Sequence, residues 1–366
     1  MLPQELLLPS RTLTGPNTIL RLLPEAAAFG NTGLLVHGRS LEKSGMLEKI
    51  LEHTPPAFFI TTHAHAGNEP TTADIDALRR RLQNTRPDWI AAVGGGSVLD
   101  LAKAAAALLD SSLPTADHLA GAPIPGSRLP LLLAPTTAGT GSEATVVAVM
   151  TDPARDLKAS IRHPSIMPRV VILDPALLAS CPPPVVAASG LDAFVQAVEA
   201  HTSRHATDFT RLFSGLASQR IAASLSPVFH GDFSRAAELL EGSYLAGIAL
   251  SHARLGLVHG LAHPLGCRYH AAHGLVCALC FPAVLHLNRD GSRAPLQSLT
   301  ELLGNDPETL TRDWLAEFSL SNIFSGQPLV ARDAIIRETL ASGSTKANPR
   351  DVTAGDVEAV LGEIFA

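Results

Sequence analysis

Residues 92–103, with the sequence AVGGGSVLDLAK, indicate how the first half of the chain is built. The apolar residues 89–93 predict a buried strand, and residues 97–109 have the apolar spacing of a helix. Between the two lies a triple glycine, Gly94, Gly95 and Gly96. Glycine has no Cβ, so a ligand can approach the backbone, and the N–H groups that begin the next helix can bind a phosphate. The stretch lacks the GxGxxG pattern of Rossmann domains and therefore predicts an anion site of another kind, with a tight capped turn as the alternative.

The same alternation of short apolar strands and helices extends through the first half of the chain. Strands are predicted at residues 32–37, 57–62, 89–93, 131–134 and 169–173, and helices at 19–29, 40–52, 72–84 and 97–109. This pattern is typical of a parallel sheet with crossover helices. From Pro184 onward only helical segments are predicted, after a proline-rich run at residues 181–184 that indicates a hinge. We therefore predict an α/β dinucleotide-binding domain over residues 1–180 and an all-helical domain over residues 181–366.

Composition excludes several classes of protein. The chain has 366 residues, of which 46% are hydrophobic and 17% charged, so it can bury large cores and is not disordered. The net charge is −6 without a basic block, and therefore neither nucleic acid nor an anionic membrane is an expected partner. No apolar run is long enough for a membrane-spanning helix, and no signal peptide is visible. Four cysteines are too few for a disulfide framework, so we expect a cytoplasmic protein.

Residues 256–288 hold five of the fifteen histidines, namely His259, His263, His270, His273 and His286. His259 and His263 are four residues apart and share one face of a helix. His273 follows a break predicted at residues 264–266, so it can face that pair from a second helix. Imidazoles placed in this way serve as metal ligands or acid–base groups. Ordinary core or surface histidines are the alternative that this segment alone leaves open.

The same segment contains a CxxC pair, Cys277 and Cys280. Such a pair can be half of a zinc site or a redox pair, but the chain has no second CxxC. The surrounding residues are apolar at helical spacing, which favours two buried core thiols.

Residues 189–203, SGLDAFVQAVEAHTS, place acidic and amide groups on an otherwise apolar helix. Gln196 lies one turn after Asp192 on the same face, and Glu199 is three residues further on. A carboxylate on an apolar face needs a metal, another cation or N–H donors as a partner.

Two further loops concern a nucleotide. Residues 134–145, APTTAGTGSEAT, carry four hydroxyl groups that can line a pyrophosphate and a ribose, on Thr136, Thr137, Thr140 and Ser142. An ordinary polar loop is the alternative.

Residues 36–40, VHGRS, bear on the choice of cofactor. An acidic residue at this position would bond the adenosine ribose 2′-OH and repel a 2′-phosphate. Gly38 and Arg39 leave space and positive charge instead, so NADP(H) is predicted over NAD(H), with a solvated arginine as the alternative.

Taken together, these motifs resemble the iron-containing (group III) alcohol dehydrogenase family. The ordered set is GGGSVLDLAK, PTTAGTGSE, GLDAFVQAVEAHTS, HGLAHPLG, HAAHG and KANPRDVTAGDVEAVL, and the resemblance runs from about residue 10 to the end. It implies an NAD(P)-binding α/β domain, a metal-binding helical domain, an active site in the cleft between them, and a homodimer.

The resemblance also implies roles for particular residues. Those implied to contact the cofactor are Gly94, Gly95, Gly96, Ser97, Thr136, Thr137, Thr140, Ser142 and Lys158, with Asp100 bracing the glycine loop. Asp192, His259 and His273 match three metal ligands, and His263 matches the histidine of a proton relay. His273 is the further candidate for a catalytic role.

One ligand departs from the family pattern, which is Asp-x-x-x-His where this chain has Asp192 and Gln196. An amide oxygen is a poorer ligand than imidazole for Fe²⁺ or Zn²⁺. Either Gln196 or water completes a weakened site, or the protein lacks metal and His263 or His273 polarises the carbonyl. We predict the weakened but usable site.

The expected reaction is reversible hydride transfer between a nicotinamide and a small primary alcohol or aldehyde, with the metal as Lewis acid. A maleylacetate reductase-like enzyme for an acidic carbonyl compound is the alternative within the family, with Arg268 as a candidate carboxylate-binding group. A lyase related to dehydroquinate synthase and a non-enzymatic binding protein are the alternatives from other classes. The lyase would need more lysines than residues 181–366 contain. Only Gln196 favours the binding protein.

Overall fold

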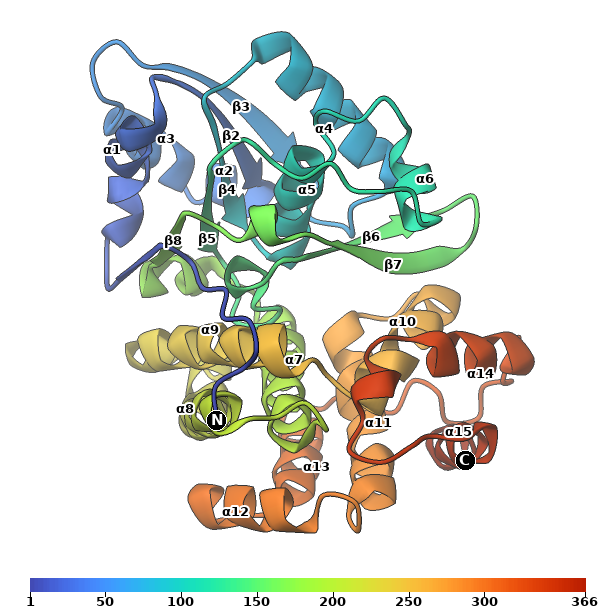
Figure 1. The fold of residues 1–366 in the computed structure, drawn as a ribbon. Coiled ribbons are helices and arrows are strands. Elements are labelled where there is room, and N and C mark those ends of the chain that lie inside the picture. Colours follow the sequence, from blue (N-terminus) through green and yellow to red (C-terminus); the bar gives the residue numbers. More distant parts are fainter. The chain divides into compact units, whose positions relative to one another are not determined.

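The computed structural model describes residues 1–366 and divides into two compact units, each of which is drawn in Figure 1. The α/β unit comprises Leu7–Thr137 and Gly141–Cys181. The helical unit comprises Pro182–Ala366 together with Met1–Leu6 and Ala138–Thr140. The predicted fold class, a parallel-sheet α/β domain followed by a helical domain, is confirmed.

Six parallel strands form the sheet of the α/β unit, in the order β1-β8-β5-β4-β2-β3. Their bounds are β1 Arg11–Thr14, β2 Thr32–Gly38, β3 Phe59–His65, β4 Trp89–Gly94, β5 Leu131–Pro135 and β8 Val170–Leu173. Strand β4 is buried along its whole length, as expected for a central strand covered by helices on both faces. Because the strands are parallel, the carboxyl ends of β2, β4 and β5 meet at one edge.

Helices cover both faces of this sheet, and the alternation of side chains along each strand separates two cores. Leu34 and Val36 of β2 pack with α4 (Thr72–Thr85) and α5 (Gly96–Ala107). Leu35 of the same strand packs in the other core, with η1, α1, α2 and α3, whose bounds are Thr18–Arg21, Leu22–Ala26, Arg39–Lys43 and Met46–Glu52.

The sequence-based assignment of this unit differs from the structure in several places. The helix predicted at 19–29 is three short ones, η1, α1 and η2 (Ala27–Phe29), and the helix predicted at 40–52 is broken at Gly45, whose φ is +68°. A hairpin of β6 (Val147–Asp152) and β7 (Leu157–Arg162) was not predicted. Its second strand, LKASIR, does alternate apolar and polar residues, so the sequence contained a signal for this strand that was overlooked.

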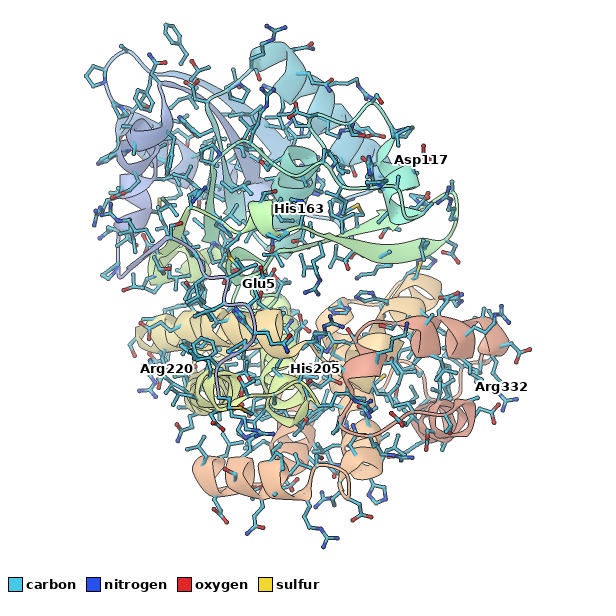
Figure 2. The ribbon with its side chains drawn as sticks, viewed as in Figure 1. Glu5, Asp117, His163, His205, Arg220 and Arg332 are labelled. Atoms are coloured by element: carbon cyan, nitrogen blue, oxygen red, sulfur yellow. The ribbon has the colours of Figure 1, made fainter.

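The loop before β5 is held by His163, which Figure 2 labels. The His163 Nδ1 lies 2.7 Å from Ser165 Oγ, and that oxygen accepts a hydrogen bond from the Ser127 backbone N–H at 2.6 Å. The remaining short elements of the unit are α6 (Thr115–Leu119), η3 (Ser142–Ala144), η4 (Pro164–Ile166) and η5 (Pro175–Ser180).

The helical unit is built around α7 (Pro183–Thr202), which packs against α8, α9 and α11. Its other elements are α8 Asp208–Phe229, η6 Phe233–Arg235, α9 Ala236–Ala253, α10 Leu257–Tyr269, α11 His273–Asn288, α12 Arg293–Leu303, α13 Pro307–Glu317, α14 Arg332–Ala341, η7 Thr345–Ala347 and α15 Ala354–Phe365. No single helix combines the length and apolar composition needed to span a bilayer, and only the pair Phe233–Ala253 and Leu257–Tyr269, bent by 105°, meets both criteria when taken together.

The break predicted at residues 264–266 is wrong. Helix α10 continues through Pro264 and ends at Tyr269, and the next residue, His270, has a φ of +49°. Pro264 and Leu265 are buried, so tertiary packing holds a turn that the proline alone disfavours.

A buried polar network fastens the loop after β5 to α5. The Lys103 ammonium donates to Ser142 O at 2.6 Å and to Thr145 Oγ1 at 3.1 Å. The Ser142 hydroxyl donates to Asp100 Oδ1 at 2.6 Å, and the Val149 N–H donates to Asp100 Oδ2 at 3.0 Å. Burial lowers the pKa of Lys103 to about 8 and raises the pKa of the neighbouring Glu143 to about 7.

The Glu143 carboxyl predicts a dependence of stability on pH. Its pKa is higher in the folded state than the ordinary value of 4.5, so the stability it contributes is fully present below that value and lost as pH rises through about 7. Between about pH 5 and 7.5, the unfolding free energy of the wild type should fall relative to that of Glu143→Gln by about 2–3 kcal/mol. Denaturant unfolding of both proteins at several pH values measures this difference, and parallel pH profiles would contradict it.

Candidate active site

Four potential metal ligands converge in the helical unit from three helices. They are Asp192 on α7, His259 on α10, and His273 and Cys277 on α11, and one ligand atom from each lies within 4.8 Å of all the others. Asp192 Oδ1 is 3.2 Å from His259 Nε2 and 3.9 Å from His273 Nε2. Asp192, His259 and Cys277 are buried, and His273 is partly exposed. The structure therefore brings together three of the four residues predicted at the metal site, Asp192, His259 and His273, and adds a thiol.

A close approach of α7 and α11 makes this convergence possible. A Cβ on Gly274 would lie 1.9 Å from the Ala188 carbonyl oxygen and 3.0 Å from Asp192 Cβ. Only glycine allows the two helices to touch here. The contact places the first residue of α11, His273, beside Asp192.

Glu199 fixes the orientation of His259. The Glu199 Oε2 atom lies 2.6 Å from His259 Nδ1, and Oε1 accepts a hydrogen bond from the Val258 N–H at 2.8 Å. With Nδ1–H donating to this carboxylate, Nε2 is the ring nitrogen that faces Asp192. The sequence showed Glu199 as an acidic residue on an apolar helix but gave it no role, because its partner is sixty residues away.

The electrostatics of the cluster require a positive charge. Burial disfavours a charged His259, but Cys277, Asp192 and Glu199 favour it more strongly, and the pKa of His259 is raised well above its ordinary value. A neutral imidazole cannot donate to a carboxylate from both ring nitrogens. Either a second proton or a metal ion must therefore lie between His259 Nε2 and Asp192. Burial raises the pKa of the Cys277 thiol to about 11, so without a metal it keeps its proton.

Gln196, the fourth residue predicted at the metal site, binds the Asp192 carboxylate through its amide nitrogen. Its Nε2 donates to Asp192 Oδ2 at 3.0 Å, and its buried Oε1 has no hydrogen-bond partner. The acceptor-only carboxylate dictates this orientation of the amide. The donor set of a carboxylate, two imidazoles and a thiol, with a buried amide oxygen nearby, fits a divalent transition metal.

His263 lies one turn after His259 on α10, half-buried, with its ring centroid 5.3 Å from that of His273. It is thus at the edge of the cluster. Arg268, predicted as a candidate substrate-binding group, instead forms a two-pronged ion pair with Glu338, at 2.5 and 2.9 Å.

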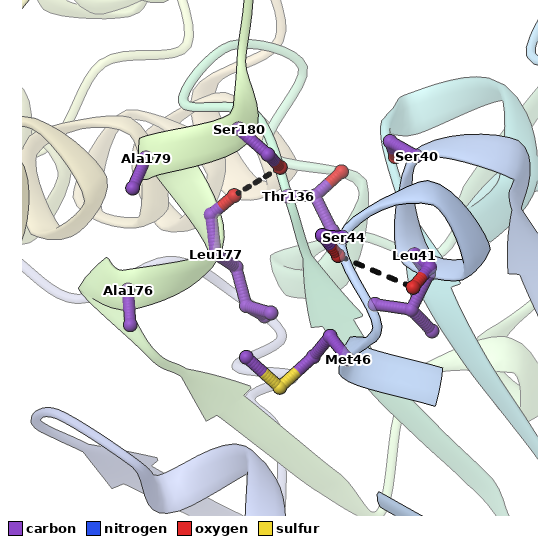
Figure 3. A pocket seen from close by; sticks show the side chains of 9 residues that line it. All are labelled: Ser40, Leu41, Ser44, Met46, Thr136, Ala176, Leu177, Ala179 and Ser180. Atoms are coloured by element: carbon purple, nitrogen blue, oxygen red, sulfur yellow. Dashed lines mark hydrogen bonds between the residues drawn. The ribbon is translucent and has the colours of Figure 1, made fainter. Parts of the chain in front are cut away.

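The predicted nucleotide-binding residues meet at the carboxyl edge of the sheet in the α/β unit. Thr136 N–H donates to Gly94 O at 3.0 Å, and a Cβ on Gly95 would lie 3.4 Å from the Thr137 side chain. Gly38 and Arg39 lie at the end of the adjacent strand β2 and the start of α2. A cavity of about 220 Å³ lies at this edge. Figure 3 shows the side chains that line it, which are Thr136, Ser40, Leu41, Ser44, Met46, Ala176, Leu177, Ala179 and Ser180.

Other residues predicted to bind the cofactor have different surroundings. Lys158 pairs with Glu69 at 2.6 Å, and the Ser142 and Asp100 side chains bond each other in the buried network. The Ser97 hydroxyl donates to Gly67 O at 3.2 Å. Thr140 belongs to the helical unit with Gly139, whose Cβ position lies 2.6 Å from Ser189 Cβ.

Comparison with known proteins identifies the family. Residues 9–175 match the family described as iron-containing alcohol dehydrogenase, and residues 186–320 match the C-terminal domain of Fe-containing alcohol dehydrogenases. The chain belongs to the iron-containing alcohol dehydrogenase family. It is an oxidoreductase that acts on alcohols and aldehydes.

Relatives in this family cover most of the chain. The probable alcohol dehydrogenase EutG of Escherichia coli is 37% identical over 77% of this chain and 72% of its own length. The lactaldehyde reductase of Escherichia coli is 30% identical over 88% of this chain and 89% of its own length. Among solved structures, the alcohol dehydrogenase from Oenococcus oeni has a TM-score of 0.90 and 26% identity, and the match covers 99% of this chain and 100% of that one.

The contact at Gly274 gives a prediction for stability. Gly274→Ala should lower the unfolding free energy by about 2–4 kcal/mol, because the new Cβ forces α7 and α11 apart. Gly362→Ala in α15 is the matched control, since no atom lies within 4 Å of its Cβ position, and it should be neutral or stabilising by up to about 1 kcal/mol. Denaturant unfolding measures both, and equal effects of the two substitutions would contradict the close approach.

Proposed function

We propose that this chain catalyses reversible hydride transfer between NADP(H) and a small primary alcohol or aldehyde. The observation that carries the proposal is the convergence of Asp192, His259 and His273 in the helical unit. The relatives named as lactaldehyde reductase and probable alcohol dehydrogenase support a small aldehyde or alcohol as the substrate. We also infer a cytoplasmic homodimer, from the cysteine content and the family resemblance.

A divalent metal, Fe²⁺ or Zn²⁺, would be held by Asp192, His259 and His273, with Gln196 beside them. When bound, it supplies Lewis acidity toward the substrate oxygen, and the nicotinamide supplies or accepts the hydride. Glu199 holds His259 in the tautomer that a metal ligand needs. Gln196, through its hydrogen bond to Asp192 Oδ2, orients the carboxylate.

The proposed proton relay uses His263. Its ring is half-buried and adjacent to His273, so it can exchange a proton with solvent and pass it toward the cluster. General acid–base help of this kind contributes about 10²–10⁴-fold to a rate. His273, at the first position of α11 and partly exposed, lies between His263 and the buried ligands.

The proposed dinucleotide site is the carboxyl edge formed by β2, β4 and β5. Glycines 94–96 and the start of α5 would bind the pyrophosphate through backbone N–H groups, with Ser97, Thr136 and Thr137 nearby. The cavity of about 220 Å³ beside Thr136 is smaller than a typical pocket of about 300–1,000 Å³, so it can take only part of a dinucleotide. Thr140, Ser142, Lys158 and Asp100 remain proposed contacts or braces of that site, and of these Asp100 and Ser142 support the loop after β5.

An uncharged aldehyde is favoured over an acidic carbonyl compound. The guanidinium of Arg268 is paired with Glu338, so a substrate carboxylate would have to displace this partner. Purified protein should therefore oxidise NADPH faster with a short aldehyde such as propionaldehyde than with a carboxylated one such as succinic semialdehyde. Asp192→Ala should reduce kcat with the short aldehyde by about a hundredfold or more, because metal affinity is lost.

Steady-state kinetics after addition of ferrous or zinc ions measure these rates. Tight NADPH binding without turnover of any aldehyde would reject the proposal in favour of a binding protein. A higher kcat/KM for the carboxylated aldehyde would select the reductase of acidic carbonyl compounds instead.

The choice of NADP(H) is tested at Gly38. Its Cβ position is 3.6 Å from the nearest atoms and its φ is −79°, so a side chain fits there. In Gly38→Asp the carboxylate should repel the 2′-phosphate and raise the KM for NADPH about tenfold or more, while the KM for NADH changes little. Gly38→Asn is the uncharged control of equal size and should keep the preference for NADPH. Preference for NADH in the wild type, or equal effects of Asp and Asn, would contradict the proposal.

A further inference from the structure

The Cys277 thiol occupies a position that neither the family pattern nor the sequence explains. Its sulfur lies 3.7 Å from His273 Nε2 and 3.8 Å from His259 Nε2. Cys277 is one turn after His273 on α11, so both side chains project from the same face of the helix. The sulfur is thus a fourth member of the cluster, not a thiol confined to the apolar core.

Four of the six distances among the four ligand atoms are close to those of a metal site, and all six are within 4.8 Å. In a tetrahedral site with metal–ligand distances of about 2.0–2.3 Å, neighbouring ligand atoms lie about 3.3–3.8 Å apart. Here the two imidazoles and the carboxylate are separated by 3.2 and 3.9 Å, and the sulfur is 3.7 and 3.8 Å from the imidazoles. One ion can therefore reach all four ligand atoms with little movement.

The Gln196 side chain binds Asp192 and has a different role from that of a metal ligand. Its NH₂ group donates to Asp192 Oδ2, so the amide nitrogen holds the carboxylate, and its buried Oε1 has no hydrogen-bond partner. The family pattern has four protein ligands, of which Gln196 replaces one. A thiol at residue 277 restores the count of four.

We propose that Cys277 is the fourth protein ligand of the metal, in place of the histidine that Gln196 replaces. This inference rests on the proposed function, because it concerns the same metal site. On binding, the Cys277 thiol releases its proton to solvent and the sulfur forms a bond to the metal. The thiolate and the Asp192 carboxylate are then the two negatively charged ligands, and His259 and His273 are the neutral ones.

A thiolate makes this site softer than one of carboxylate and imidazoles alone. Soft sulfur ligands favour Zn²⁺ among the available divalent metals. The site should consequently retain Zn²⁺ in preference to Mn²⁺ or Mg²⁺. Replacing the sulfur by oxygen should lower the affinity for Zn²⁺ more than the affinity for Mn²⁺.

Cys280 provides a matched control for the role of Cys277. It is also buried, lies three residues later on the same helix, and is not a member of the four-residue cluster. Cys277→Ser and Cys280→Ser each exchange one buried sulfur for oxygen. A loss of metal binding caused only by damage to α11 would appear in both variants.

Cobalt substitution of the full chain tests the proposal without relying on activity. The wild type should bind one equivalent of Co²⁺ and show the intense near-ultraviolet charge-transfer band of a thiolate bound to cobalt. Cys277→Ser should lose this band and bind Co²⁺ and Zn²⁺ more than about tenfold more weakly, whereas Cys280→Ser should retain both properties. Adding Gln196→His to Cys277→Ser should restore the affinity but not the band.

The outcomes distinguish a failure of the proposed ligand role of Cys277 from a failure of the proposed function. A wild-type cobalt protein without the band, or a Cys277→Ser protein that keeps the band and affinity, overturns the ligand role of Cys277. Absence of cobalt and zinc binding in the wild type overturns it as well. If the wild type reduces aldehydes but shows no band, the proposed function stands alone; if the band is present without turnover of any aldehyde, only the ligand role stands.

Discussion

The buried contact of His259 with two carboxylates is the constraint on which the helical unit depends. Glu199 and Asp192 face opposite nitrogens of one imidazole, so two negative groups and one imidazole share an apolar interior. Burying charge without compensation costs several kcal/mol, and a cation between His259 and Asp192 offsets that cost. The packing of α7, α10 and α11 thus forms a buried site that needs a cation.

Glycines at two helix contacts make that construction sterically possible. A Cβ on Gly274 would collide with the backbone of α7, and a Cβ on Gly256 would lie 2.7 Å from Glu199 Oε1. The second glycine precedes α10 and lets Glu199 reach both the Val258 N–H and the His259 ring. The ligands are therefore fixed by backbone approach and by hydrogen bonds to carboxylates before any metal binds.

The sequence predicts local features well and pairings between distant segments poorly. Five strands of the parallel sheet and the residues Asp192, His259 and His273 were predicted, because apolar spacing and motifs are visible within a dozen residues. The pairings Glu199–His259 and Arg268–Glu338 join residues sixty and seventy positions apart, and no local pattern reveals them. Cys277 was interpreted as a core thiol because its neighbours are apolar; it is indeed buried, but the direction of its sulfur depends on how α10 packs against α11.

The presence of Gln196 in place of the family's histidine and the position of Cys277 have one physical explanation. A histidine at residue 196 would be a neutral ligand, so Asp192 would be the only negatively charged group bound directly to the ion. The Cys277 thiolate supplies the second negative charge from α11, and the side chain at residue 196 is then released to hold Asp192 by a hydrogen bond. Because the Gln196 amide can donate while a metal-bound imidazole nitrogen cannot, the exchange of ligands also converts residue 196 from a ligand into a group that orients one.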